Sequence, residues 1–482
     1  MISKVILDQS LLIQSINQQQ IKKYDILTKK QKYAYSLGHF FNDLCASCWF
    51  NYFLYWIKYI IKLNKASYAL LSGQIFAAIS TAIVGYFSDK THTQLGSRMP
   101  WYIVGFVLVL VSFIPIFHRF VGENKELFEN ENINQTEKEI YYIIFASIFN
   151  IGRSFMQVSH MALIPSLTSS MKKRDWLNNM RNTFGYIANL LVLSCALILF
   201  QFIQDSKLDF EILVYIIYFF GIFTSFFFII NINEVNLQKG CYEKTAENII
   251  ISLQNQTDST INLNILQGHE CRWQDWLKKK KFYVFAFVFV GCRVYFNSIS
   301  TMMSFYLVYV MKVASKDEVV NKTPIEIALV PLVLYTSCVI TSSLLNEIFK
   351  IIGKKSAFAL GGFFMLSASI MLGFAQQNMY FLMYIISIFT GCAQSLTMNT
   401  AITFISDVVG NKDKSCSFVF GFYTFFDKIF TGFVLFFISE SQYFNSEEFI
   451  RWVTVSLPCV FCGSACILVY FINVQDYKKN NK

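Results

Sequence analysis

The stretch GYFSDKTHTQLGSRMPW, residues 85–101, separates two apolar runs that are each long enough to cross a bilayer. Gly85 allows backbones to approach closely, and Asp89 and Arg98 place opposite charges within one short connection, where they can bridge neighbouring helix ends. A charged connection this short predicts two membrane helices that are joined at the membrane surface.

The composition is typical of a protein that crosses the membrane many times. Of the 482 residues, 54% are hydrophobic, 17% are aromatic and 15% are charged, and the mean hydropathy is +0.43. These values lie far from the averages of soluble proteins. The net charge of +10 is spread over short loops rather than gathered in one basic domain, which favours membrane topology over nucleic-acid binding as its cause.

The apolar runs predict an all-α integral membrane protein with twelve transmembrane helices in two six-helix halves. We expect an N-terminal tail over residues 1–32, halves over 33–232 and 282–473, a cytosolic linker over 233–281 and a C-terminal tail over 474–482. The predicted helices lie near residues 33–61, 67–88, 101–121, 140–168, 183–204, 211–232, 282–312, 325–345, 357–375, 380–408, 416–439 and 449–473.

Basic residues set the expected orientation. The loops on the side of the N-terminus carry 27 lysines and arginines, far more than the loops of the opposite side. Both termini are therefore predicted to be cytosolic. The glycosylation acceptors Asn134 and Asn321 then fall outside the cytosol, whereas Asn255 falls in the linker and should stay unmodified.

Other chemistries find little support in the sequence. Cys45 and Cys48 form a C-x-x-C pair within an apolar helix and are interpreted as packing residues, so no metal site and no cofactor are expected. The chain has no Walker-type phosphate loop and no H-E-x-x-H pair. We therefore do not expect an enzyme or an ATP-driven pump.

Charged and amide side chains interrupt several predicted helices. A charge at the bilayer centre costs about 2.5–3.5 kcal/mol even on the lenient insertion scale, so each needs a partner or a wet cavity. Several of these side chains share a helix face at spacings of three, four or seven residues. They predict a solute site formed by Asn42, Asp43, Arg153, Gln157, His160, Arg293, Asn297, Gln394 and Asn399, and cation coupling by His39, Asp43, Asp427 and Lys428.

The loop over residues 85–101, with Arg98 followed by Pro100 and Trp101, resembles the connection between helices 2 and 3 of major facilitator superfamily transporters, especially the sugar:cation symporter branch. In that fold helices 1, 4, 7 and 10 line a central cavity, and this loop helps to latch the two halves. The resemblance implies gating roles for Gly85, Asp89 and Arg98, together with Arg181.

Three further segments resemble one group within that branch, the major facilitator superfamily domain-containing protein twelve family. They are GHFFNDLCASCWFNYFLYW at residues 38–56, SHMALIPSLT at 159–168 and SFVFGFYTFFDKIFTG at 417–432. One departure is Ser166, where the family usually has an acidic residue. The resemblance implies import of cysteine into a lysosome-like organelle, a substrate that composition and spacing do not indicate.

We therefore expect a secondary active transporter that works by alternating access, with a small amino acid as substrate, a proton as coupling cation and the lipid bilayer as its surroundings. Arg153 and Arg293 are candidate partners for the carboxylate and Asp43 for the ammonium group, while His39 and Asp43 form the candidate proton site. Two alternatives stay open: a sugar:cation symporter, and a receptor or scaffold without transport. The plasma membrane is the alternative location.

The topology is tested by glycosylation and by tags. We expect a glycan at Asn134 that is lost in Asn134→Gln, because the acceptor lies in a non-cytosolic loop. A tag in the linker or at the C-terminus should be digested by protease added to sealed vesicles. Protection of either tag, or a glycan at Asn255, would contradict the predicted orientation.

Overall fold

The computed structural model describes residues 27–118, 135–168, 171–203, 205–237, 273–313, 323–377, 379–409 and 416–471, and these residues are almost entirely helical. Ten of the described helices are long and apolar enough to cross a membrane. The two further crossings are the first, which is divided into short elements, and the fourth, which carries a polar stripe. The prediction of twelve membrane helices in an all-α fold is confirmed.

The first crossing consists of α2 (Lys29–Leu37), α3 (Phe40–Cys48), η1 (Trp49–Phe53) and η2 (Trp56–Ile60). The rest of the N-terminal half contains α4 (Ala66–Phe87), the short η3 (Ser88–Lys90), α5 (Met99–Ile116), α6 (Gln135–Ala162), α7 (Ile164–Leu167), α8 (Met171–Phe202) and α9 (Ser206–Asn231). After α11 (Trp273–Leu277), the C-terminal half contains α12 (Lys280–Tyr309), α14 (Glu326–Ile352), α15 (Lys354–Phe374), α16 (Tyr380–Val409), α17 (Cys416–Glu440) and α18 (Glu447–Phe471).

Some helices begin earlier than hydropathy predicts. Helix α2 begins at Lys29 rather than near residue 33, because Thr28 and Gln31 form a reciprocal capping box. Helix α8 begins at Met171, twelve residues before the predicted start at 183. Its first turns are polar, and a helix that leaves the membrane needs no apolar residues. Hydropathy therefore located the membrane-embedded part of each helix better than its end.

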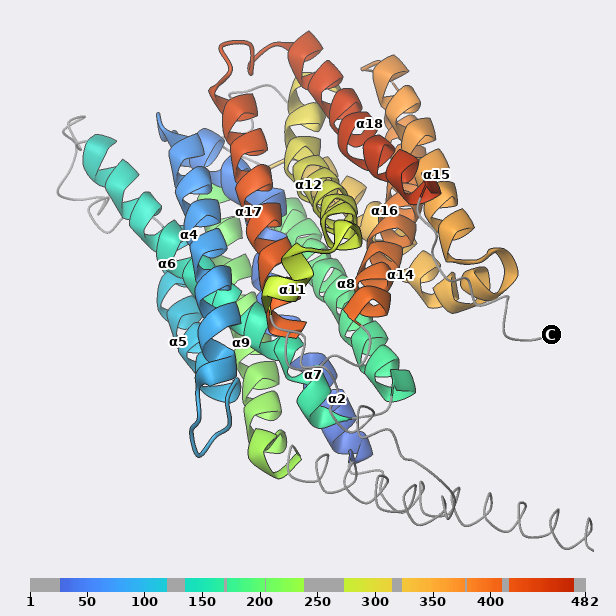
Figure 1. Cartoon of the computed structure of the whole chain (residues 1–482). Helices are drawn as coiled ribbons and strands as arrows, with labels where there is room; N and C mark the ends of the chain where they lie inside the picture. Colours follow the sequence, from blue (N-terminus) through green and yellow to red (C-terminus); the bar gives the residue numbers. More distant parts are fainter. Residues whose placement is uncertain are drawn as a thin grey trace, which may run out of the picture.

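The two halves lie side by side. Figure 1 shows α4, α5, α6 and α9 on one side and α14, α15, α16 and α18 on the other. The halves meet where α4 packs against α17 and where α8 packs against α14. Small residues bring α4 and α17 close together: a Cβ atom on Gly421 would lie 3.6 Å from the Cα atom of Gly85, and one on Gly432 would lie 2.7 Å from the Cβ atom of Gln74.

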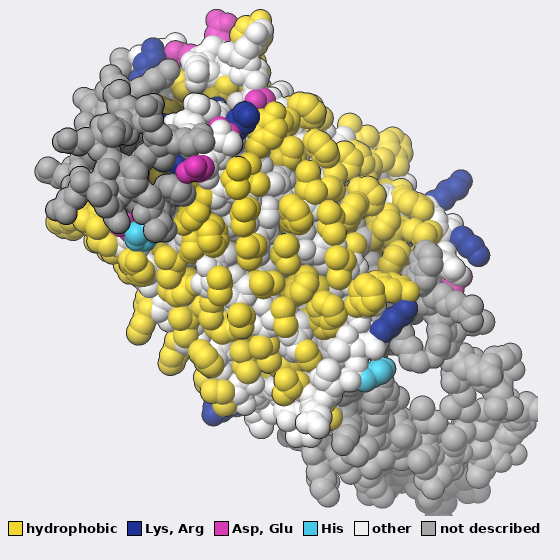
Figure 2. All heavy atoms as spheres, turned by 90° about the vertical axis from the view of Figure 1, so that its left-hand side faces the viewer, with side chains coloured by type: hydrophobic (Ala, Val, Ile, Leu, Met, Phe, Trp, Pro, Cys, Tyr) yellow, Lys and Arg dark blue, Asp and Glu magenta, His cyan; other side chains and the backbone are white. Residues whose placement is uncertain are grey.

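The flank of the molecule is apolar. Figure 2 shows hydrophobic side chains spread across one side and charged side chains toward its two ends. Large apolar side chains on several helices are strongly exposed, among them Phe219, Ile230 and Phe374 at 71%, 77% and 77%. Such side chains are compatible with lipid as the surrounding solvent, since every backbone group of a helix is already paired within it.

Several polar contacts between the halves lie on the side away from α2. Hydroxyl groups of α12 donate to backbone carbonyls of η1: Thr301 Oγ1 lies 2.8 Å from Phe50 O, and Ser304 Oγ lies 3.2 Å from Asn51 O. Lys58 Nζ donates to Ser439 O at 3.2 Å. The first crossing is thus tied to helices α12 and α17 of the other half at this end.

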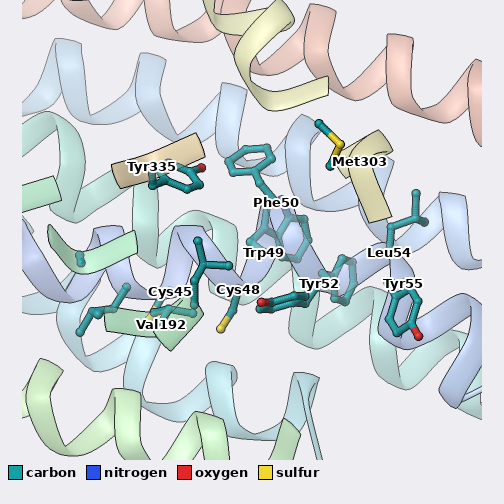
Figure 3. Close-up of a cluster of buried hydrophobic side chains, with 14 of the residues drawn as sticks. Cys45, Cys48, Trp49, Phe50, Tyr52, Leu54, Tyr55, Val192, Met303 and Tyr335 are labelled. Carbon is teal, nitrogen blue, oxygen red and sulfur yellow. The ribbon is translucent and has the colours of Figure 1, made fainter. Parts of the chain in front are cut away.

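A buried cluster surrounds the same part of the first crossing. Figure 3 shows Phe50 projecting on the side of Tyr335 and Met303, whereas Cys48 and Val192 lie on the other side. All five side chains are buried. Both cysteines of the C-x-x-C pair are buried free thiols, as expected for packing residues.

A close helix crossing gives a stability prediction. Gly152 of α6 meets Gly105 of α5 so closely that a Cβ atom on Gly152 would lie 2.8 Å from Gly105 O. We expect Gly152→Ala to destabilise the protein by about 1–3 kcal/mol, because overpacking forces the helices apart. The thermal unfolding midpoint in detergent measures this effect. Gly463→Ala is the matched control, since nothing lies within 4 Å of its Cβ position; an equal loss in both variants would contradict the prediction.

Candidate functional site

A cavity lies between the two halves. It contains about 1020 Å³ of empty space, part of which is open to solvent. Helices α3, α6 and α8 form one wall, and α12, α14, α16 and α17 form the other. Its polar lining consists of His39, Asn42, Asp43, Arg153, Gln157, Arg181, Asn182, Tyr186, Asn189, Arg293, Asn297, Tyr335, Asn399 and Thr424.

The cavity occupies only one end of the bundle. Most of its lining residues lie in the half of their helix nearer the end at which α2 begins, and Phe50 is the last residue of the first crossing to contact it. The next carbonyls and hydroxyls along the bundle, from Phe50 to Ser304, tie the halves together. The cavity is therefore closed on the side away from the N-terminus.

A first polar cluster lies on α3. His39 Nδ1 is 2.9 Å from Asp43 Oδ1, and its Nε2 is 3.3 Å from Arg181 Nη2 and 3.1 Å from Asn42 Nδ2. Because a guanidinium group can only donate, Nε2 accepts and the ring proton lies on Nδ1, toward Asp43. His39 thus connects α3 to α8 in its neutral form.

A second polar cluster joins α12 to α17 within the C-terminal half. Arg293 Nε lies 3.2 Å from Asp427 Oδ2, and Asn297 Nδ2 and Thr431 Oγ1 both donate to Asp427 Oδ1 at 3.4 Å. Asp427 is fully buried. This carboxylate is therefore compensated by its neighbours, and Arg293 already has an acidic partner.

Two buried basic side chains, Arg153 and Lys428, belong to neither cluster. The side chains of Arg153 and Lys428 are 4% and 2% exposed, and Arg153 Nε, Arg153 Nη1 and Lys428 Nζ have no hydrogen-bond partner within the described part of the chain. Both lie beside the same ring: the centroid of Phe50 is 5.6 Å from Arg153 Cζ and 5.9 Å from Lys428 Nζ.

Some predicted site residues lie away from the lining. His160 stacks on Tyr35 with the ring centroids 4.3 Å apart, and its Nε2 is 2.8 Å from Tyr35 O. Gln394 accepts a hydrogen bond from Cys338 Sγ at 3.6 Å. Asp427 and Lys428 lie behind the lining on α17. The other predicted solute and coupling residues line the cavity: His39, Asn42, Asp43, Arg153, Gln157, Arg293, Asn297 and Asn399.

Helix α8 supplies lining residues that were not predicted. Asn182, Tyr186 and Asn189 face the cavity at spacings of four and three residues, which is the same stripe pattern that singled out helices 1, 4 and 7. Tyr186 OH also donates to Asn399 Oδ1 across the halves, at 3.4 Å. The stripe was present in the sequence and could have been found by the same rule.

The expected gating residues occupy different places. Arg181 lines the cavity, and Gly85 lies against Gly421 of α17 in the other half. Arg98 Nη1 lies 3.8 Å from Glu234 Oε1, and the backbone N–H groups of Arg98 and Met99 both donate to Glu234 Oε2 at 2.9 Å. Glu234, which the sequence did not single out, thus caps α5 from within the same half.

Three predicted residues are not placed by the structure. Asn134 and Asn321 lie outside the described residues, and the side chain of Asp89 is not described. Their predicted roles in glycosylation and gating stay predictions.

Comparison with known proteins shows what the chain is similar to in sequence and in fold. The sequence profile of a family described as "MFS/sugar transport protein" matches residues 34–261. Major facilitator superfamily domain-containing protein 12 of Homo sapiens is 26% identical over 454 residues, which cover 88% of this chain and 89% of that protein. Over almost its whole length, the chain is similar to proteins of the major facilitator superfamily. The proteins of that name from Equus caballus and Mus musculus also match about nine tenths of this chain. These long matches confirm the resemblance to the domain-containing protein twelve family.

Further proteins match less of the sequence or only the fold. The uncharacterized symporter sll1374 of Synechocystis is 29% identical over 164 residues, covering 34% of this chain and 29% of that protein. The xylose transporter XylE of E. coli, in a partially occluded inward-open conformation, superposes with a TM-score of 0.64 at 13% identity, covering 94% of this chain and 99% of XylE. The likeness to XylE shows the fold, and the solute has to be argued from the cavity.

Proposed function

We propose that this membrane transporter moves a small solute with a carboxylate group, an amino acid with cysteine as the first candidate, from the cytosol into a lysosome-like organelle. The observation that carries the proposal is Arg153, a buried guanidinium group that faces a cavity without a partner among the described residues. A carboxylate matches the planar fork of a guanidinium group and can accept two parallel hydrogen bonds from it.

The position of the cavity fits alternating access. With the N-terminus in the cytosol, the cavity faces the cytosol and its far side is closed by the contacts of the first crossing with α12 and α17. A rocking movement of the halves would exchange this arrangement for one that opens to the other side. The proposed direction and organelle rest on the family resemblance.

Two other functions make different demands on the cavity. A sugar would use neutral hydrogen-bonding groups and aromatic faces, and Phe50, Phe289, Phe296 and Tyr335 do line it. A neutral sugar, however, would leave the buried charge of Arg153 uncompensated. A receptor or scaffold without transport needs no solute path, so measured flux distinguishes it from a carrier.

Uptake into vesicles tests the proposal. Wild-type protein should take up labelled cysteine, and Arg153→Lys should reduce uptake about tenfold or more, since a hydrogen bond to a charged group contributes about 1.5–3 kcal/mol. A labelled hexose run in parallel serves as the control. Uptake of the hexose but not of cysteine, or full cysteine flux in Arg153→Lys, would leave the sugar:cation symporter as the better proposal.

The proposed proton coupling depends on His39. Protonation would add an N–H group at Nε2, so this atom could no longer accept hydrogen bonds from Arg181 and Asn42. The contact of α3 with α8 would then break. We expect uptake by the wild type to change between about pH 5 and 8, and the variants His39→Gln and Asp43→Asn to show a flatter profile. Unchanged profiles in variants that reach the membrane would refute the coupling.

A further inference from the structure

The charges around the cavity do not balance. Four basic side chains, Arg153, Arg181, Arg293 and Lys428, lie around the cavity with two carboxylates, Asp43 and Asp427, among the residues that the structure describes. His39 is neutral in its observed contacts. The excess of positive charge therefore persists after every observed ion pair has been counted.

Arg181 contacts the neutral ring of His39, and the excess includes Arg153 and Lys428 as well. Asp427 already contacts Arg293, and Asp43 contacts His39. The unpaired nitrogen atoms of Arg153 and Lys428 are buried, and both side chains lie near the same ring, that of Phe50. An aromatic face compensates a buried cation only in part, so both groups still lack an anion.

These two cations come from opposite halves. Arg153 lies on α6 and lines the cavity. Lys428 lies on α17, one helical turn beyond the lining residue Thr424, and so on the same helix face. Phe50, which contacts both cations, is itself a lining residue. Arg153 thus lines the cavity, and Lys428 lies directly behind the lining, beside Phe50.

The net charge of a solute decides whether it corrects this imbalance. A zwitterion brings a carboxylate and an ammonium group, so it leaves the excess charge unchanged. An anion of the same size lowers the excess and adds no cation that must find a partner. Desolvating cations without a counter-charge is costly, which favours the anion as the cavity closes around it.

We propose that this site selects a small organic anion over a zwitterion of the same size, and that Arg153 and Lys428 together hold its acidic group. This inference rests on the proposed function, a carrier for carboxylate-bearing solutes, and adds the net charge of the preferred solute and the second residue that binds it. An amino acid enters the same site through its carboxylate, and its ammonium group lowers the affinity.

Three thiols of similar size test the inference on the purified full-length protein in lipid nanodiscs. 3-Mercaptopropionate carries only the carboxylate, cysteine carries both charged groups and cysteamine carries only the ammonium group. The shift of the thermal unfolding midpoint with ligand concentration gives each dissociation constant. We expect the anion to bind at least about tenfold more tightly than cysteine, and cysteamine to give no shift.

Variants assign the effect to Lys428. Lys428→Gln should remove the difference between 3-mercaptopropionate and cysteine, and Lys428→Arg should retain it because the positive charge remains. The matched control is Lys350→Gln, which changes an exposed lysine on α14 that pairs with Glu347, and it should leave the order of affinities unchanged. The wild-type order is informative even where a variant fails to fold.

The outcomes separate this inference from the proposed function. Tighter binding of cysteine than of 3-mercaptopropionate, or an unchanged preference in Lys428→Gln, would overturn the selection of an anion and leave a carrier for amino acids. Binding of a hexose with no response to any of the three thiols would overturn the proposed function as well. An anion preference that depends on Lys428 would support the inference.

Discussion

Charge buried within a bilayer must be paired or hydrated, and this constraint determines the arrangement of the polar residues in the protein. The charged side chains of α3, α6, α12 and α17 converge on one cavity instead of being scattered over the bundle. Two of them, Asp43 and Asp427, are carboxylates whose partners lie on the same half. These contacts need not break when the halves move relative to each other. Arg153, which has no such partner, lines the cavity.

Backbone groups within the membrane must be hydrogen-bonded as well. The π-helical turns η1 and η2 interrupt the regular ladder of the first crossing, and hydroxyl groups of α12 bond to carbonyls within η1. These hydroxyl groups belong to the opposite half, so the irregular part of the helix lies where the halves are in contact. The closed end of the cavity is therefore held by short polar contacts that can be exchanged, in addition to apolar packing.

The sequence predicted the membrane helices well, but it did not predict which side chains contact one another between helices. Hydropathy identified twelve helices because lipid exposure imposes an apolar surface over a fixed length. Of the polar stripes on helices 1, 4 and 7, His39, Asn42, Asp43, Arg153, Gln157, Arg293 and Asn297 line the cavity. His160 continues the stripe of α6 yet stacks on Tyr35, because the neighbouring helix changes toward the end of α6. The contact of Glu234 with Arg98 joins residues far apart in the chain, and helical spacing carries no information about such a pair.

Arg153 and Lys428 belong to different halves. A ligand that only binds in the cavity can therefore differ from one that is also transported. A ligand that contacts both cations gains free energy as the halves approach, so its affinity for the closed arrangement exceeds its affinity for the open one, and it shifts the population by that difference. A ligand that reaches only Arg153 gains nothing from closure. Such a molecule would occupy the cavity without being carried and would act as a competitive blocker, so a good inhibitor of this carrier is a ligand that is recognised by one half alone.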